Sequence, residues 1–108
     1  MELKSLLKNK LSFSQKVWNL CKRIPKGRVS TYREIAKALK TKAYRAVGSA
    51  LNKNPYAPVV PCHRVVNSDG RVGGFVRETK KKLEMLKKEG VKVKNNKIEN
   101  FEKVFFRL

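Results

Sequence analysis

The sequence predicts one mainly α-helical domain with a small β component and a helix-turn-helix. Apolar side chains recur at helical spacing in several short segments. Two of these segments are joined by the short connector 40–42, which is typical of a helix-turn-helix. Short valine runs and an Asn-Asn turn near the C-terminus predict the β component. A chain of 108 residues is the size of one domain, so we expect a single unit over 1–108.

The first helix is expected over residues 14–21. Ser14 is its predicted N-cap, and Phe13 stands in the position of a hydrophobic staple before that cap. Cys21 belongs to the apolar stripe of this helix, so we place its thiol in the core. The Ile-Pro-Lys-Gly segment 24–27 then ends the helical region and turns the chain.

The second and third helices form the predicted helix-turn-helix. Thr31 followed by Glu34 resembles a capping signal, which predicts a helix over 32–39. The third helix is expected over 43–51. Its small residues, which would let another backbone come close, are Ala46, Gly48, Ser49 and Ala50. An alternative is that both helices are simply core helices of a small α-rich domain.

The second half of the chain is predicted to be more irregular. Two prolines break the helical pattern over 52–58, and valine pairs flank the tetrapeptide Pro-Cys-His-Arg at 61–64. A fourth helix is expected over 78–88, with Gly90 ending it. A hairpin turning at 95–96 follows. The apolar residues expected to anchor the tail are Phe101, Val104, Phe105 and Phe106.

The charge of the chain predicts a polyanionic partner. Lys and Arg number 27 against 8 Asp and Glu, which gives a formal net charge of +19. Such an excess favours binding to nucleic-acid phosphates. A lysine-rich proteome is the alternative, but it would normally bring matching glutamates. The third helix offers Arg45 and little else to read base edges, so sequence-specific recognition in the major groove is not expected.

Several classes of protein are excluded by the same composition. No apolar run approaches the ~20 residues of a membrane span, and the N-terminus lacks the pattern of a signal peptide. Two cysteines make no disulfide framework. We therefore expect a cytoplasmic protein without a membrane partner.

Cys62 stands in a context that predicts chemistry. His63, the only histidine of the chain, and Arg64 follow it directly, and Glu89 is a candidate to orient the imidazole. A neighbouring base or positive charge activates a thiol as a nucleophile. On an extended strand the Cys62 and His63 side chains would point apart, so contact would need a turn or a bridging water. A small buried residue is the alternative for Cys62, and the spacing of Cys and His gives no metal site.

An ordered series of motifs resembles the O6-alkylguanine-DNA alkyltransferases, also called methylated-DNA–protein cysteine methyltransferases. The resemblance covers about residues 13–93. The motifs are VW at 17–18, IPKGRVSTYREIA at 24–36, RAVGSAL at 45–51, NP at 54–55, VPCHRVV at 60–66, SDGRVGGF at 68–75, and the segment from Lys82 to Gly90.

The resemblance implies the C-terminal active-site domain of that family, a winged-helix-like fold with a helix-turn-helix. It implies DNA repair by irreversible transfer of an alkyl group from O6 of guanine to Cys62, with one turnover per molecule and no metal or organic cofactor. The partner would be double-stranded DNA containing O6-alkylguanine, bound through the minor groove with the nucleotide flipped out. A nucleoid-associated monomer is expected.

The resemblance also implies roles for individual residues. Cys62 would accept the alkyl group, with His63 as a water-assisted base and Glu89 orienting His63. Tyr32 would help to rotate the nucleotide and give a proton to the leaving guanine, and Asn54 would brace the active-site turn. The residues expected at the DNA are Arg45, inserted into the vacated stack, and Tyr32, Arg33, Ala46, Gly48 and Ser14.

The sequence departs from the family pattern in several places. The usual N-terminal domain is expected to be absent, and the connector 40–42 lacks the usual glycine. Phe75 replaces a frequent tyrosine, and residues 76–78 are Val-Arg-Glu where the family has small or polar residues and glycines. These changes predict weaker hydrogen bonds to the O6 substituent and an altered adduct preference.

A binding module is the alternative function. Alkyltransferase-like proteins recognise alkylated guanine and flag it for another repair pathway without transfer. They are similarly short, but they typically replace the acceptor cysteine, so the presence of Cys62 favours transfer. A helix-turn-helix regulator would leave Cys62, His63 and Glu89 unexplained.

Overall fold

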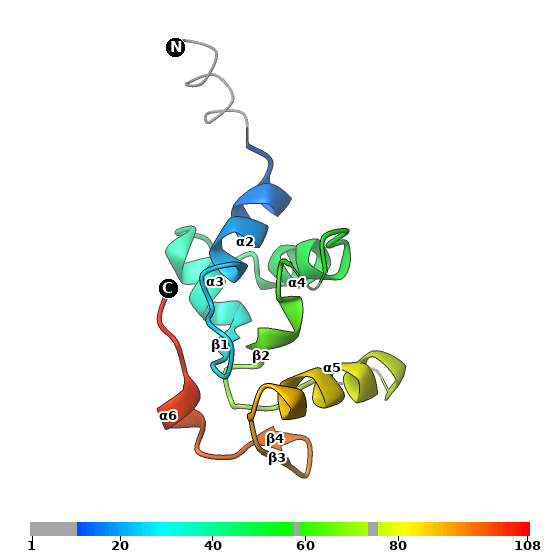
Figure 1. Ribbon diagram of the computed structural model, residues 1–108. Helices are drawn as coiled ribbons and strands as arrows, with labels where there is room; N and C mark the ends of the chain where they lie inside the picture. The colour runs from blue at the N-terminus through cyan, green and yellow to red at the C-terminus, as the bar shows by residue number, and fades with distance from the viewer. Residues whose placement is uncertain (1–10, 58, 74–75) are drawn as a thin grey trace.

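Most of the chain is helical, with a few very short strands between the helices (Figure 1). The computed structural model describes residues 11–57, 59–73 and 76–108, with no side chains described for 76–79. The elements are α2 (Phe13–Cys21), β1 (Ser30–Thr31), α3 (Tyr32–Ala38), α4 (Tyr44–Asn52), the 3₁₀ turn η1 (Cys62–Arg64), β2 (Val65–Val66), α5 (Val76–Lys88), β3 (Val93–Lys94), β4 (Lys97–Ile98) and α6 (Phe101–Val104). The predicted class, mainly helical with small sheets, is confirmed.

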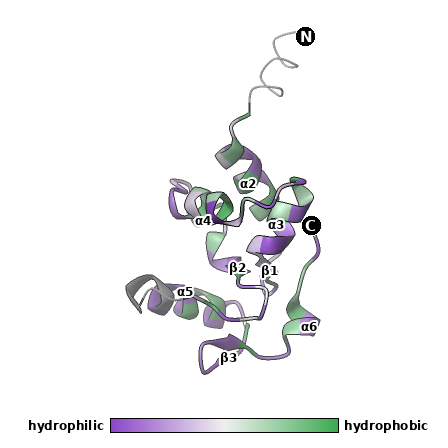
Figure 2. Ribbon diagram, turned by 180° about the vertical axis from the view of Figure 1, so that it is seen from behind, coloured by the Kyte–Doolittle hydropathy of each residue, from purple (hydrophilic) through white to green (hydrophobic). Residues whose placement is uncertain are grey.

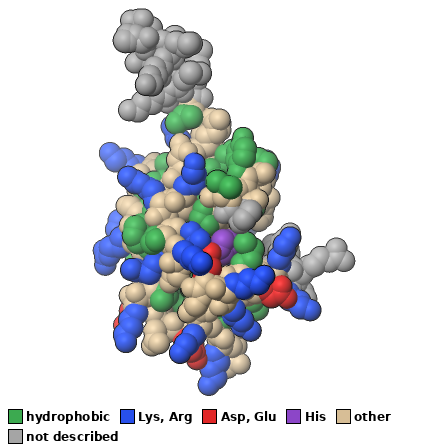
Figure 3. Space-filling model, in the orientation of Figure 1, with side chains coloured by type: hydrophobic (Ala, Val, Ile, Leu, Met, Phe, Trp, Pro, Cys, Tyr) green, Lys and Arg blue, Asp and Glu red, His purple; other side chains and the backbone are tan. Residues whose placement is uncertain are grey.

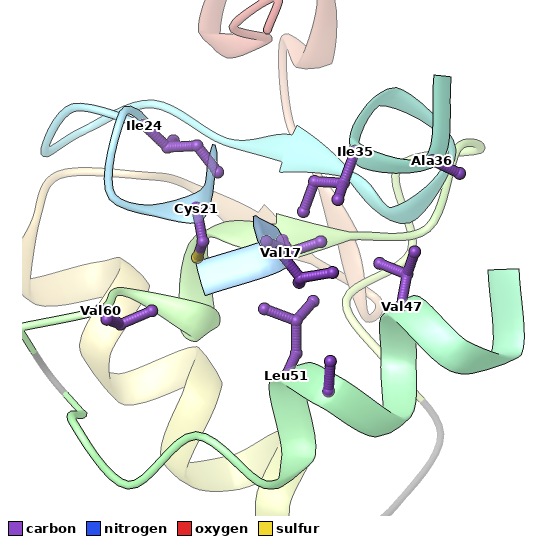
Figure 4. Close-up of a cluster of buried hydrophobic side chains, with 10 residues drawn as sticks. Val17, Cys21, Ile24, Ile35, Ala36, Val47, Leu51 and Val60 are labelled. Carbon is purple, nitrogen blue, oxygen red and sulfur yellow. The ribbon is translucent and has the colours of Figure 1, made fainter. Parts of the chain in front are cut away.

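Two groups of buried side chains hold these elements together. The first lies among α2, α3 and α4, and Figure 4 shows its side chains converging from these helices. The second lies under α5 and the β3–β4 hairpin and includes Val29, Val66, Leu86 and Ile98. Seen from behind, α5 carries both hydrophilic and hydrophobic stretches (Figure 2). Leu86 is fully buried while Lys87 and Lys88 are exposed, as the amphipathic pattern predicted.

The first helix begins earlier than the sequence suggested. Ser12, and not Ser14, is the N-cap of α2. The Ser12 hydroxyl accepts the backbone N–H of Gln15 at 3.1 Å, and Gln15 Oε1 accepts the Ser12 N–H at 2.9 Å. This reciprocal capping box satisfies two backbone donors, whereas a cap at Ser14 would satisfy neither of them. The prediction of Ser14 as N-cap is therefore wrong, and that residue lies inside the helix.

The helix-turn-helix is formed by α3 and α4. Thr31 caps α3 as predicted, because its Oγ1 accepts the Glu34 N–H at 3.0 Å. The glycine-free connector is accommodated by Lys40, which takes a left-handed conformation with φ of 57°. Its N–H and that of Thr41 donate to carbonyls of the last turn of α3, both at 3.0 Å. Lys40 thus replaces the usual glycine at a helix end, at a cost of about 1 kcal/mol.

The pairing of β1 with β2 was not predicted. The two strands are parallel, with Ser30 opposite Val65 and Thr31 opposite Val66. The pairing joins the start of α3 to the residues that follow the Pro-Cys-His-Arg segment. It therefore fixes the position of the helix-turn-helix relative to that segment. The predicted hairpin is present, with β3 and β4 paired antiparallel.

The C-terminal tail returns to the strand region of β1. The Val29 N–H donates to Val104 O at 2.9 Å, and the Phe106 N–H donates to Val29 O at 2.7 Å. Arg28 donates to the carbonyls of Val104 and Phe105 at 3.1 and 2.9 Å. The tail is anchored as predicted, since Val104 packs on the second core and Phe106 on the first. Within the described ranges, no helix is long and apolar enough to cross a membrane.

Candidate active site

Cys62 lies on a tight turn. The segment Cys62–Arg64 forms the 3₁₀ turn η1, in which the Cys62 N–H donates to Val60 O and the Arg64 N–H to Pro61 O, both at 2.9 Å. Consecutive side chains on such a turn do not alternate between two faces as they do on a strand. Cys62 is half-buried and His63 is buried, and both line the same cavity.

Asn54 holds the loop that leads into this turn. Its Nδ2 donates to Val60 O at 2.8 Å, and its Oδ1 accepts the Tyr56 N–H at 2.9 Å. One side chain thereby bonds to the backbone at both ends of a bend that ends two residues before Cys62. These two hydrogen bonds link the Asn54 side chain to the backbone on either side of the bend.

A cavity of about 1160 Å³ brings most of the predicted site residues together. It lies between the exposed face of α4, η1 and the α5 helix. The predicted residues that line it are Tyr32, Arg33, Arg45, Gly48, Asn54, Cys62 and His63. Ala46 is exposed on α4 and Ser14 lies in the first turn of α2, and neither lines the cavity. Tyr44, exposed at the start of α4, also lines it and was not singled out from the sequence.

Glu89 lies behind His63, at the C-terminal end of α5. Its Oε2 is 3.0 Å from His63 Nε2. The Arg64 guanidinium donates to both carboxylate oxygens, from Nε at 2.9 Å and from Nη2 at 2.6 Å. Burial acts to raise the pKa of Glu89, but the hydrogen bonds and positive charges of Arg64 and His63 outweigh it and lower the pKa to about 2. The carboxylate is therefore ionised at neutral pH.

Tyr32 and Lys82 meet at the cavity wall. Lys82 Nζ is 3.4 Å from the Tyr32 hydroxyl and 5.6 Å from the centroid of its ring. Burial raises the pKa of the Tyr32 phenol, and Cys62 and Cys21 raise it further, so the phenol keeps its proton. Burial lowers the pKa of Lys82 to about 8, against the opposing effect of Cys62 and Cys21. The sequence placed Lys82 within a motif but gave it no role, because only the fold brings it to Tyr32.

The two thiols differ in accessibility. Cys21 is fully buried in the first core, as predicted (Figure 4). Burial, together with the nearby Cys62, raises the pKa of the Cys21 thiol to about 12, so it does not form a thiolate at neutral pH. Cys62 is the thiol that an external group can reach.

Positive charge surrounds the site. Figure 3 shows Lys and Arg side chains distributed over the visible face, with few acidic ones among them. Arg33, Arg45, Arg71, Lys81 and Lys82 all line the cavity, with Asp69 as its one acidic residue among those described. The described residues contain no group of three or more His, Cys, Asp or Glu placed to hold a metal ion. The predictions about Gly74 and Phe75 concern residues outside those that the structure describes, as do the predictions about the side chains of 76–78.

Comparison with known proteins identifies similar sequences and structures. Residues 12–91 match the family described as 6-O-methylguanine DNA methyltransferase, DNA binding domain. The methylated-DNA–protein-cysteine methyltransferase of Sulfolobus acidocaldarius is 46% identical over 82 residues, which are 76% of this chain and 52% of that protein. The one of Methanosarcina acetivorans is 48% identical over 79 residues, 72% of this chain and 51% of that protein.

A solved structure extends this comparison. The Schizosaccharomyces pombe protein Atl1, in complex with damaged DNA containing O6-carboxymethylguanine, superimposes with a TM-score of 0.78 at 29% identity. The match covers 89% of this chain and 95% of Atl1. By contrast, the chain spans about half the length of the methyltransferases it matches.

Proposed function

The chain belongs to the family of 6-O-methylguanine DNA methyltransferase DNA-binding domains, and from this premise we propose that it repairs DNA by taking an alkyl group from O6 of guanine onto Cys62. One observation carries the proposal. The Cys62 thiol lines a cavity together with Tyr32, Arg45 and His63, and Glu89 is hydrogen-bonded to His63 from behind. The cavity therefore contains a nucleophile in Cys62, a base in His63 and a proton donor in Tyr32.

The reaction balances with the groups at hand. The Cys62 sulfur attacks the alkyl carbon, a carbon–sulfur bond forms, and the bond between that carbon and O6 breaks. The electron pair of the broken bond stays with guanine, which takes a proton from the Tyr32 phenol. The thiol proton leaves through water to His63, whose positive charge Glu89 stabilises. The product thioether has no labile bond, so each molecule acts once.

Lys82 supports the thiolate by its charge. Lys82 lines the same cavity as Cys62, and its ammonium group contacts the phenol that loses a proton. A positive charge nearby favours both the thiolate and the phenolate. With a pKa of about 8, Lys82 is mostly charged at neutral pH and loses this charge under mildly alkaline conditions.

We expect Lys82→Met to slow alkyl transfer by about tenfold at neutral pH. The ratio of native to variant rate should fall toward one as the pH rises through about 8, because the neutral amine of the native chain stabilises no anion. Single-turnover rates on either side of that pH measure the ratio. Lys80→Met, at an exposed lysine of the same helix, is the control and should leave the rate unchanged. A ratio that stays constant with pH would contradict the role of the charge.

The surface of α4 suits a close approach to DNA. An added Cβ at Gly48 would meet nothing within 4 Å, so the helix has open space where a sugar-phosphate backbone can come near. Arg45 is exposed on the preceding turn and lines the cavity. We place the DNA minor groove against this helix, with Arg45 in the gap left by the flipped nucleotide and the protein bound as a monomer.

Arg45→Ala should slow transfer from duplex DNA by at least about tenfold, because refilling the stack offsets a flipping cost of a few kcal/mol. Transfer from a single-stranded oligonucleotide, which has little stacking to lose, should change much less. Arg45→Lys keeps the charge and separates phosphate attraction from insertion. An equal loss on both substrates would show that Arg45 does not act on flipping.

Intact-mass measurement tests the proposal as a whole. After incubation with a duplex containing O6-methylguanine, the native protein should gain one methyl group, and peptide mapping should locate it on the peptide that carries Cys62. The same duplex with unmodified guanine is the control. Tight binding to the modified duplex without a mass change would overturn transfer.

The sensor function is the second candidate, favoured by the match to Atl1 over nearly the whole length of both chains. A sensor would hold the alkylated base in the cavity and leave its bond intact. The reachable Cys62 thiol and the hydrogen-bonded His63 and Glu89 side chains support transfer instead, since binding of an alkylated base requires none of these three residues. The mass experiment separates the two functions.

A further inference from the structure

Arg64 connects three segments that are far apart in the sequence. Its Nε and Nη2 donate to the Glu89 carboxylate at the end of α5, and its Nη1 donates to Ile24 O at 2.8 Å, in the turn after α2. The side chain is 16% exposed and that of Glu89 is 12% exposed. The hydrogen bonds described for this guanidinium therefore hold either the Arg64 side chain itself or the Glu89 carboxylate in place.

The carboxylate in turn determines which nitrogen of His63 carries the proton. An ionised carboxylate only accepts hydrogen bonds, so the ring nitrogen facing it must donate. That nitrogen is Nε2, 3.0 Å from Glu89 Oε2. A neutral imidazole has one N–H, and Nδ1 is then left as the acceptor that a base requires.

Glu89 could not fix this tautomer by itself. It lies just after the last helical residue of α5, and burial of its carboxyl group favours the protonated form. A protonated carboxyl group could donate to Nε2, which would leave the imidazole proton on Nδ1. The paired bonds from Arg64 to both oxygens remove this alternative, because a bidentate guanidinium favours the ionised carboxylate and fixes its plane.

We infer that Arg64 is a positioning residue, which holds the Glu89 carboxylate so that His63 keeps its proton on Nε2 and presents Nδ1 as the base. Arg64 does not line the cavity and acts only through Glu89. The inferred tautomer of His63 does not depend on the reaction, whereas the use of Nδ1 to deprotonate Cys62 rests on the proposed function.

Nitrogen NMR of protein labelled at the imidazole tests the inference, because the chain has a single histidine. Under conditions in which the ring is neutral, the native protein should give one protonated and one bare nitrogen signal, with the proton on Nε2. In Arg64→Gln the two signals should move toward each other by at least half of their separation as the tautomers mix. Arg64→Lys, with its charge kept but its paired geometry lost, should fall between the two.

Arg28→Gln is the matched control. Arg28 is also partly buried and binds backbone carbonyls, but it does not contact Glu89. It should lower stability and leave the imidazole signals in place. Unchanged signals in Arg64→Gln, or an equal change in Arg28→Gln, would overturn the inference. If Arg64→Gln does not fold, native signals in Arg64→Lys would overturn it in the same way.

The rate of transfer links the inference to the reaction. Arg64→Gln should transfer the methyl group about tenfold more slowly than the native chain, with duplex affinity unchanged. A native protein that takes up no methyl group would overturn the proposed function and leave the tautomer result standing. A native rate in Arg64→Gln would overturn the positioning role alone.

Discussion

We expect the Cys62→Ala variant to lose alkyl transfer completely and to bind duplex DNA within about twofold of the native affinity, because phosphate contacts dominate that affinity. No other described thiol can take its place. Cys21 is fully buried, and burial, with Cys62 nearby, raises its pKa to about 12. Intact mass after incubation with an O6-methylguanine duplex measures transfer, and a gel-shift titration measures binding.

Cys21→Ala is the matched control for this experiment. It removes the other thiol from the first core, where a slightly smaller side chain costs about 1 kcal/mol of stability, and should leave transfer intact. Methylation that persists in Cys62→Ala, or that moves to the peptide carrying Cys21, would contradict the assignment of the nucleophile.

Glu89→Gln should reduce the free energy of unfolding by about 3 kcal/mol at neutral pH, because a pKa lowered from 4.5 to about 2 represents that difference between folded and unfolded states. The folded state lowers the pKa, so the stabilisation is full above about 4.5 and is lost as the pH falls toward 2. The variant also leaves the guanidinium of Arg64 without its ionic partner, which is costly when buried.

Urea unfolding at several pH values measures this effect. The gap between native and Glu89→Gln stability should close as the pH approaches 2. Asp69→Asn is the control, because Asp69 forms an exposed pair with Arg71 at 3.5 Å, and such pairs contribute about 0–1 kcal/mol. A pH-independent gap would show that Glu89 acts through packing instead of charge. Alkyl transfer should also slow in Glu89→Gln, since the amide stabilises the charged imidazole poorly.

Local patterns predicted the helices well. Apolar spacing located α2, α3, α4 and α5 to within two residues at each end, and the Thr31 cap was found from its neighbours. The wrong prediction of Ser14 as N-cap also has a local cause. Two serines precede the helix pattern, and only Ser12 stands three residues before Gln15, which completes the capping box. Interactions between residues within one helical turn of each other can therefore be predicted from the local sequence.

Contacts between residues far apart in the sequence could not be predicted from local sequence patterns. The strands β1 and β2 contain two residues each, too few for any alternation, and they pair across more than thirty residues. Arg64 meets Glu89 from 25 positions away, and Lys82 meets Tyr32 from 50. The family motifs located Cys62, His63 and Glu89, but Arg64 was considered only as a positive charge beside the thiol, because its pairing with Glu89 depends on the fold.

The tail after residue 91 lies beyond the residues that match the family model, and its hydrogen bonds hold the backbone just before α3. Val104 and Phe106 bond to Val29, and the Leu108 N–H donates to Glu34 at 3.4 Å. Under the proposed reaction each molecule acts once, so the number of lesions repaired cannot exceed the number of intact copies. Sequence changes in this tail should therefore alter how many copies persist in the cell, and with them the number of lesions removed, while each surviving molecule reacts at its usual speed.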